Sequence, residues 1–290
     1  MAGLVYGFIS LLQQERNTDA TVDSGKAATD AENREKRKDE EEKKKEAGPP
    51  VEQAPGAPNF YGVRFAFPDK ITDLQGGGEA GYGTQEYSDW FARNQAVRVG
   101  IDVYRVTLSP LHEGTVVIQN MRISDRKCEP TRYSGTAVVP PPIGDGGDDV
   151  EPKTVGFDLT EPAPRPRIVA GRVPQPRPGV EVWKLKGNAF SEGVYLDGGE
   201  QGDARTFDLF FFAGESDCEF RVEVNITSGT EDAWYPLKLG KRSKVEVAGQ
   251  ANRYESVVLP RSVDYTDPVQ NELKGPGNPF DILKIEKGSF

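Results

Sequence analysis

Two cysteines and a single histidine are the side chains of this sequence best suited to covalent or metal chemistry. Cys128 and Cys218 come from separate segments that alternate apolar and polar residues. Such a pair forms a structural disulfide in an oxidising compartment, or it packs as two small buried thiols. We expect the disulfide, because the N-terminal segment described below points to the same compartment. Two cysteines and one histidine make a zinc site implausible, and we expect no metal and no cofactor.

Three short patterns resemble catalytic motifs but lack the groups that the chemistry needs. Ser124 begins an S-x-x-K pattern, yet neither S-D-N nor K-T-G accompanies it. The glycine-rich run at 76–83 is not followed by the Lys-Ser/Thr of a phosphate loop. His112 lies between Pro110 and Gly114, which predicts an exposed hairpin turn with no nucleophile beside it. We therefore expect that the protein is not an enzyme.

Two acidic clusters and one sequon are weaker candidates. The first cluster lies at 145–149; the second consists of Asp197, Glu200 and Asp203. Carboxylates on Gly-rich loops can bind Ca²⁺, but neither run follows the D-x-D-x-D-G pattern, and solvated turns explain both. Asn225 begins an N-x-T sequon, and its place on the outward face of a strand explains it equally well.

Aromatic residues supply the candidate ligand platforms. Exposed rings on a sheet or loop can stack on sugars or anchor a protein partner, whereas core and turn packing is the alternative for each one. We expect Trp234 to be the most exposed, since it follows the turn GTED outside a clean alternation. The candidates are Trp234, Tyr235, Trp183 and Tyr82, with Trp90, Tyr87 and Tyr195 as further members of the group.

The elements that would position these residues are strands. From Asn59 onward the apolar residues recur with a period of two, clearly so at 218–227, and amphipathic helices are almost lacking. This pattern predicts an all-β fold, an antiparallel β-sandwich of Ig-like or jelly-roll-like type, over residues 59–290. The stretch 140–179 is rich in Pro and Gly and predicts a long insertion holding one or two edge strands, or a linker between two smaller sandwiches.

Two details of the strand pattern are specific enough to test. The apolar phase slips between Val103 and Val106, which predicts a β-bulge near Tyr104–Arg105. The segment at 206–213 is apolar on both faces in its second half, which predicts a central strand.

The first 14 residues form an apolar segment. GLVYGFISLL would span about 15 Å as a helix, half of a bilayer core, so it cannot cross alone. We expect this segment to be the remnant of a membrane-spanning helix. The alternatives are an interfacial anchor and a short helix packed on a partner or on its own domain. The flank after it has no Lys/Arg excess, which allows it to lie on the translocated side.

Residues 15–58 predict a spacer. Opposite charges recur four residues apart, as in Glu32 with Lys36 and Asp39 with Lys43, which favours a solvated, partly formed helix. No apolar a/d positions are present, so a coiled coil is not expected. The segment at 48–58 is rich in Pro and Ala and should break the helix.

Charge and layout together indicate the class of function. The net charge of −10 argues against nucleic acid as a partner. We expect a non-enzymatic module, tethered to the cell membrane through residues 1–14 by a single pass with the domain outside, or secreted. It would bind an unknown protein or glycan, or support the cell envelope. The alternatives are a secreted-type hydrolase with paired carboxylates and a phage or surface-appendage structural protein.

Overall fold

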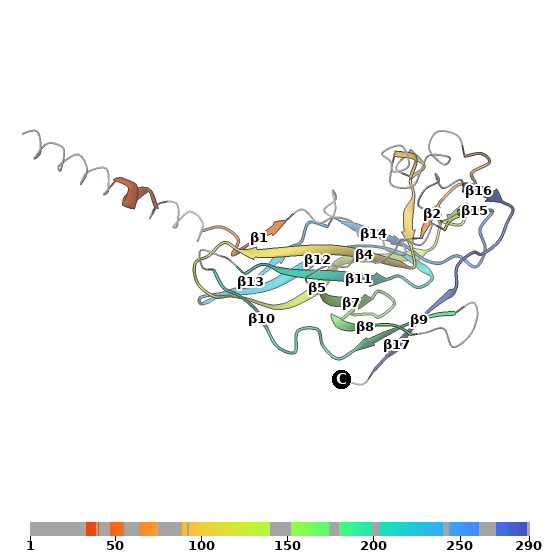
Figure 1. Ribbon diagram of the computed structural model, residues 1–290. Coiled ribbons are helices and arrows are strands. Elements are labelled where there is room, and N and C mark those ends of the chain that lie inside the picture. Colours follow the sequence, from red (N-terminus) through yellow and green to blue (C-terminus); the bar gives the residue numbers. More distant parts are fainter. Residues whose placement is uncertain are drawn as a thin grey trace, which may run out of the picture. The chain divides into compact units, whose positions relative to one another are not determined.

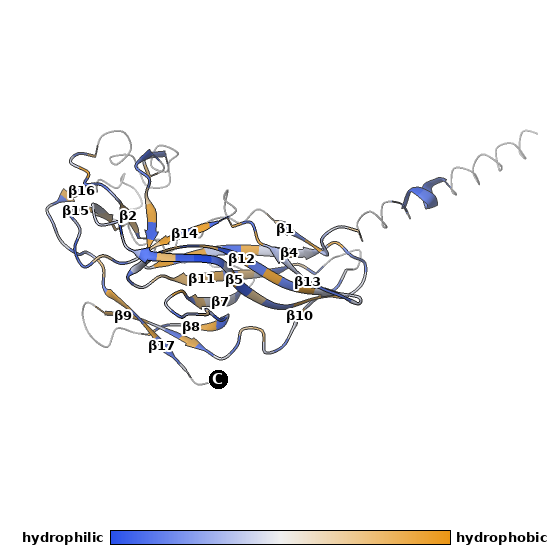
Figure 2. Ribbon diagram, turned by 180° about the vertical axis from the view of Figure 1, so that it is seen from behind, coloured by the Kyte–Doolittle hydropathy of each residue, from blue (hydrophilic) through white to orange (hydrophobic). Residues whose placement is uncertain are grey.

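The computed structural model describes residues 33–38, 40, 47–54, 64–74, 89–91, 93–139, 152–173, 180–198, 203–239, 244–260 and 271–288. The chain divides into two compact units, Met1–Pro50 and Val51–Phe290. The predicted membrane segment, Tyr82, Tyr87, the acidic cluster at 145–149 and Glu200 lie outside the described residues. In the first unit, residues 33–38 and 40 are helical and exposed, and Figure 2 shows this helix as hydrophilic.

The second unit is an all-β domain with two sheets (Figure 1). The first, called here the seven-stranded sheet, has β11 near its centre, as predicted for the segment at 206–213. Its order is β1 (Val51–Ala54), β4 (Ile101–Pro110), β11 (Arg205–Phe212), β7 (Lys153–Asp158), β8 (Arg167–Val173), β9 (Val180–Lys186) and β17 (Ile282–Lys287).

The ten-stranded sheet is built around the long pair β5 and β12, and β13 (Glu231–Pro236) pairs with β12 outside the main order. That order is β10 (Val194–Leu196), β5 (Val116–Pro130), β12 (Ser216–Ser228), β14 (Val245–Ala248), β3 (Val97–Val99), β2 (Phe65–Phe67), β6 (Thr136–Val138), β15 (Ser256–Pro260) and β16 (Asn271–Lys274).

Both sheets are mixed, so the purely antiparallel prediction is wrong. β7 runs parallel to β11, and β17 runs parallel to β9. In the other sheet, β14 pairs with β3 and β15 pairs with β6 in parallel. Strands that are far apart in sequence make these pairs, which alternation along the chain does not specify.

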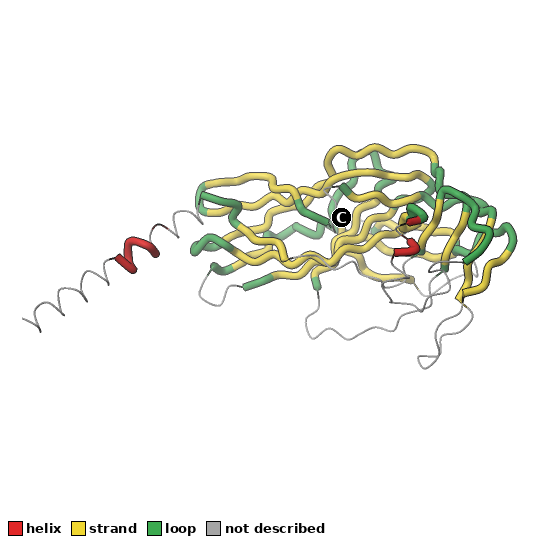
Figure 3. Tube along the Cα trace, turned by 90° about the horizontal axis from the view of Figure 1, so that it is seen from above, coloured by secondary structure: helices red, strands yellow, loops and turns green. Residues whose placement is uncertain are grey.

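One apolar core lies between the two sheets, whose strands form the layers visible in Figure 3. The seven-stranded sheet contributes fully buried side chains such as Leu209 and Phe211, and the ten-stranded sheet contributes Phe220 and Val224. The rings of Phe211 and Phe220, one from each sheet, have centroids 4.8 Å apart. The alternation predicted for 218–227 is confirmed on its apolar face, since Cys218 to Ile226 at every second position is buried.

The phase slip within β4 arises because this strand carries apolar residues on both faces. Ile101 packs in a separate cluster with Phe212, whereas Val106 and Leu108 belong to the core between the sheets. The chain leaves the ten-stranded sheet after β3 and enters the seven-stranded sheet at β4, with Gly100 between them at φ +74°. The Gly100 N–H donates to Ala248 O, and its carbonyl accepts from Ala213 N. The pairing of β4 with β11 is continuous from 101 to 108, so the predicted bulge at 104–105 is wrong. The change of sheet falls at Gly100, whose φ favours glycine, and is separate from the slip.

Three further features of the fold differ from the sequence-based expectation. β7 and β8, which lie in the 140–179 stretch, are interior rather than edge strands of their sheet. β4 and β5 belong to different sheets, so the turn at His112 is not a hairpin. The domain begins at Val51 rather than Asn59, because β1 pairs with β4 and Gln53 exchanges two side-chain hydrogen bonds with the Lys238 backbone.

Candidate functional site

The predicted disulfide is confirmed. Cys128 on β5 lies directly opposite Cys218 on β12, their Cα atoms are 4.2 Å apart, and the two sulfurs are bonded. Cys218 belongs to the buried core, whereas Cys128 is exposed. The bond closes a loop with a sequence separation of 90 residues, which contains β6 to β11.

The described aromatic candidates do not form a common platform. Trp234 is half-buried and stacks on the Arg122 guanidinium, 4.1 Å from its ring centroid, so the expected strong exposure is wrong. Tyr235, next to it, packs on the core between the sheets. Trp183 lies in the other sheet, where its indole N–H donates to Glu181 at 3.0 Å. The exposed aromatic residue among those described is Tyr195, with 63% of its surface accessible.

Two of the suggested catalytic residues, His112 and Ser124, lie in the described part of the chain, and the glycine-rich run at 76–83 lies outside it. His112 is half-buried, and its Nδ1 lies 2.8 Å from the Ser228 hydroxyl. The Ser124 hydroxyl is buried and has no hydrogen-bond partner among the described groups. The two residues lie on different segments, so the structure does not bring them together, and His112 contacts Ser228 instead.

Asp203 and Asn225 also make hydrogen bonds with side chains of the domain. The Asp203 carboxylate accepts from Arg205 at 2.6 Å, which leaves it poorly placed as a calcium ligand. Within the described chain, no group of three or more His, Cys, Asp or Glu residues is arranged to hold a metal ion. Asn225 is buried, and its amide donates to Asp232 at 2.6 Å, so the expected exposed sequon is wrong.

Buried carboxylates in the described residues are paired with arginine or lysine. Asp208 binds Arg105 through two hydrogen bonds of 2.8 and 3.0 Å. Asp102 pairs with Arg98, and burial raises the pKa of its carboxyl although the arginine opposes that shift. Paired carboxylates of a hydrolase need one free acid and one free base, and these groups are already committed to cations.

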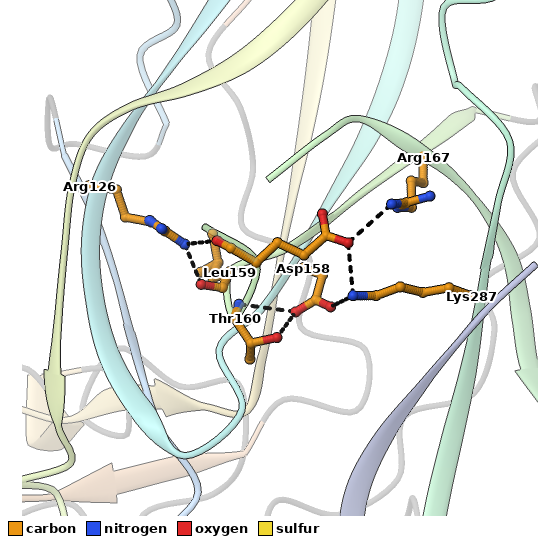
Figure 4. Close-up of polar contacts among 7 residues, drawn as sticks. Arg126, Asp158, Leu159, Thr160, Arg167 and Lys287 are labelled. Carbon is orange, nitrogen blue, oxygen red and sulfur yellow. Dashed lines mark hydrogen bonds and ion pairs between the residues drawn. The ribbon is translucent and has the colours of Figure 1, made fainter. Parts of the chain in front are cut away.

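A larger ionic network holds the turn between β7 and β8 (Figure 4). Asp158 accepts from the backbone and hydroxyl of Thr160 at 3.0 and 2.6 Å. Lys287, on β17, bridges Asp158 and Glu161 at 2.6 and 2.8 Å, and Arg167 reaches Glu161 at 3.0 Å. The network thus joins the last strand of the sheet to this turn.

Opposite charges keep the network ionised. Burial disfavours the charged form of Glu161, but the hydrogen bond from Lys287 and the charge of Arg167 outweigh it, so the pKa of Glu161 is lowered. Burial acts against the charge of Lys287 in the same way, and Asp158 and Glu161 reverse the effect, so the pKa of Lys287 is raised. A lowered carboxyl pKa is the opposite of what a general acid needs.

Arg126 fixes the same turn from the other sheet. It extends from β5, and its guanidinium donates to the carbonyls of Leu159, Glu161 and Pro162, the last two at 2.6 and 2.9 Å. Figure 4 shows this clamp on one side of the turn and Lys287 on the other. Side chains of both sheets therefore anchor the turn.

The end of this turn lines a cavity of about 390 Å³, called here the donor pocket, with Asn120, Arg165, Pro166 and Asn188 on its walls. Asn120 lies on β5 beside the register shift between Asn225 and Ile226. Ala189 N donates to Pro166 O at 3.1 Å, which joins the turn after β9 to the turn before β8. The pocket is therefore assembled from three segments that are distant in sequence.

Sequence reasoning did not identify the donor pocket. Its residues are one arginine, one proline and two asparagines with no motif spacing between them. The only local signal is the tendency of asparagine to hydrogen-bond the backbone one or two residues on, which marks turns in general. A second cavity, of about 350 Å³, lies near Lys70, Ser134 and Arg253.

Comparison with known proteins gives no match: no family model, no curated protein and no solved structure resembles this chain. In the described part of the chain, no helix has the length and apolar character that crossing a bilayer requires.

Proposed function

We propose that the protein is a non-enzymatic binding module of the cell envelope, held to the membrane through residues 1–14 and displayed outside it on the charged spacer. Its domain is a β-sandwich that presents turns and a pocket to a ligand. The observation that carries this proposal is the Cys128–Cys218 disulfide, which favours an oxidising compartment.

Binding rather than catalysis is supported by the state of the polar side chains. The described buried carboxylates have cationic partners, and the pKa of Glu161 is lowered rather than raised. The motif residues Ser124 and His112 are placed apart on separate segments, β5 and the turn before it. A turn that is anchored from both sheets and lies beside a pocket suits recognition, because preorganised groups lose little entropy on binding.

The test is the oxidation state of the cysteines in cells that make the protein. Acid quenching followed by alkylation and mass spectrometry should find Cys128 and Cys218 bonded in nearly all molecules. Reduction before alkylation provides the control that both sites can be labelled. Two alkylated thiols in the unreduced sample would contradict display in an oxidising compartment.

A further inference from the structure

Hydrogen-bond donors predominate among the polar side chains that line the donor pocket. Asn120 Oδ1 accepts from Met121 N at 2.9 Å, and Asn188 Oδ1 accepts from Phe190 N at 2.9 Å. A backbone N–H can only donate, so the atom it meets in each side chain is the oxygen. Each asparagine therefore has one acceptor position of its oxygen occupied, and both N–H groups of its NH₂ remain available.

Other asparagines of the domain use that NH₂ group internally. Asn94 donates to Trp90 O at 2.8 Å, Asn225 donates to Asp232, and Asn278 donates to Ala251 O at 3.3 Å. Within the described chain, the NH₂ groups of Asn120 and Asn188 have no such acceptor. Asn120 is half-buried and Asn188 is exposed, so water or a ligand supplies the acceptors for these two groups.

The charge of the described wall is positive. Arg165 is exposed and has no ion pair within the described residues, and it adds the planar donor fork of a guanidinium. No described carboxylate lines the cavity. Lys153 lies over the ring of Phe190, 5.2 Å from its centroid, and Phe190 belongs to the turn that carries Asn188. Glu192 interacts electrostatically with the same lysine.

We propose that the donor pocket binds a carboxylate-bearing ligand. This rests on the proposed function and names its ligand class. A carboxylate offers acceptor oxygens only, pairs with a guanidinium through two parallel hydrogen bonds, and carries the single negative charge that one arginine balances. The remaining acceptor positions meet the two NH₂ groups, and Pro166 provides an apolar wall for the carbon skeleton. The carboxylate can come from a peptide C-terminus or from a uronic acid.

The experiment is a titration of the isotope-labelled full chain, followed by the side-chain NMR signals of asparagine and arginine at constant ionic strength. N-acetyl-alanyl-alanine and glucuronate are the probes, and the peptide amide and glucose are their neutral counterparts. We expect a saturable shift of the Asn120 and Asn188 NH₂ signals with at least one acid and none with its neutral counterpart. The acid that binds identifies the source.

Four variants of equal net charge separate the pocket from general electrostatics. Asn188→Asp keeps the oxygen that Phe190 N needs and replaces the donor by a second acceptor, and Arg165→Gln removes the guanidinium. Asn252→Asp and Arg253→Gln make the same charge changes at exposed positions outside the pocket. The pocket variants should weaken binding by about tenfold or more, whereas the two controls should match the parent chain.

Specific outcomes would overturn the proposal. Equal affinities in all four variants would show that the pocket is not the site, and saturation by inorganic phosphate without either acid would show that the ligand class is wrong. Absence of any saturable shift at tens of millimolar would reject the site itself. If Asn188→Asp does not fold, Asn120→Asp tests the same argument, since it keeps the acceptor for Met121 N. These results do not depend on where the cell places the protein, so they fail separately from the proposed function.

Discussion

At the scale of single residues, the Arg98–Asp102 pair is a buried ionic contact whose loss should strongly lower the stability of the fold. Asp102 is 1% accessible, and its Oδ1 accepts from both Arg98 and Val103 N. Removing the arginine leaves a buried carboxylate without its cation, which costs more than the pair itself contributes to stability.

We predict that Arg98→Met lowers the free energy of unfolding by about 3–5 kcal/mol, measured by urea denaturation. Asp102→Asn removes the charge and keeps an oxygen for Val103 N. The double variant should therefore lose less stability than the sum of the two single variants. Strict additivity would mean that the two side chains are not coupled.

Lys287 gives a prediction about pH. Its removal leaves Asp158 and Glu161 without their shared cation, and we expect Lys287→Met to cost about 2 kcal/mol at neutral pH. Because the folded-state pKa of Glu161 is lowered, its stabilising effect is present above the unfolded pKa and is lost as the pH falls through the folded pKa. The stability gap between parent and variant should therefore shrink in acid, which denaturation curves at several pH values below neutrality will measure.

Lys184→Met, at an exposed pair 3.9 Å long, is the control and should show a small gap at every pH. An undiminished gap for Lys287→Met in acid would count against the ionic account.

At the scale of elements, the sequence predicts the strands whose alternation is clean and misses those whose pattern is short or polar. β11 and β12 carry long apolar faces, and their observed bounds are close to the predicted segments 206–213 and 218–227. β13 reads EDAWYP and has no period of two, and β8 lies within a Pro-rich stretch. The parallel partners were not predictable, since pairing depends on contacts between distant segments. β4 imitated a bulge because its apolar residues change from one face of the strand to the other while its pairing with β11 stays continuous.

The first strand supplies an element-scale prediction. β1 covers one side of β4, and Gln53 makes two hydrogen bonds with the Lys238 backbone. A chain that begins at Gly48 should keep the thermal stability of the full protein, whereas one that begins at Asn59 should lose about 1–3 kcal/mol, because backbone groups of β4 and Lys238 lose their partners. Calorimetry of both chains measures the difference. Equal stability would mean that β1 contributes nothing and that the domain starts at Asn59.

At the scale of the whole molecule, the disulfide was predictable and the donor pocket was not. The chain has only two cysteines, and its apolar N-terminal segment indicated an oxidising compartment, so their pairing could be predicted, whereas Asn120, Arg165 and Asn188 meet only through the tertiary fold. The turn that carries Arg165 is held by Arg126 from one sheet and Lys287 from the other. The all-β class could be read from the sequence, and the ligand-binding geometry required the structure.

Display outside the membrane is the central claim of this account, and labelling of intact cells tests it most directly. A membrane-impermeant amine reagent is applied to cells that make the protein, before and after lysis, and labelled peptides are quantified by mass spectrometry. Lys186 and Lys284 are exposed on the domain and report its location. We predict that both are labelled as strongly in intact cells as in lysed cells. Labelling that appears only after lysis, while a surface protein in the same sample is labelled throughout, would contradict the account.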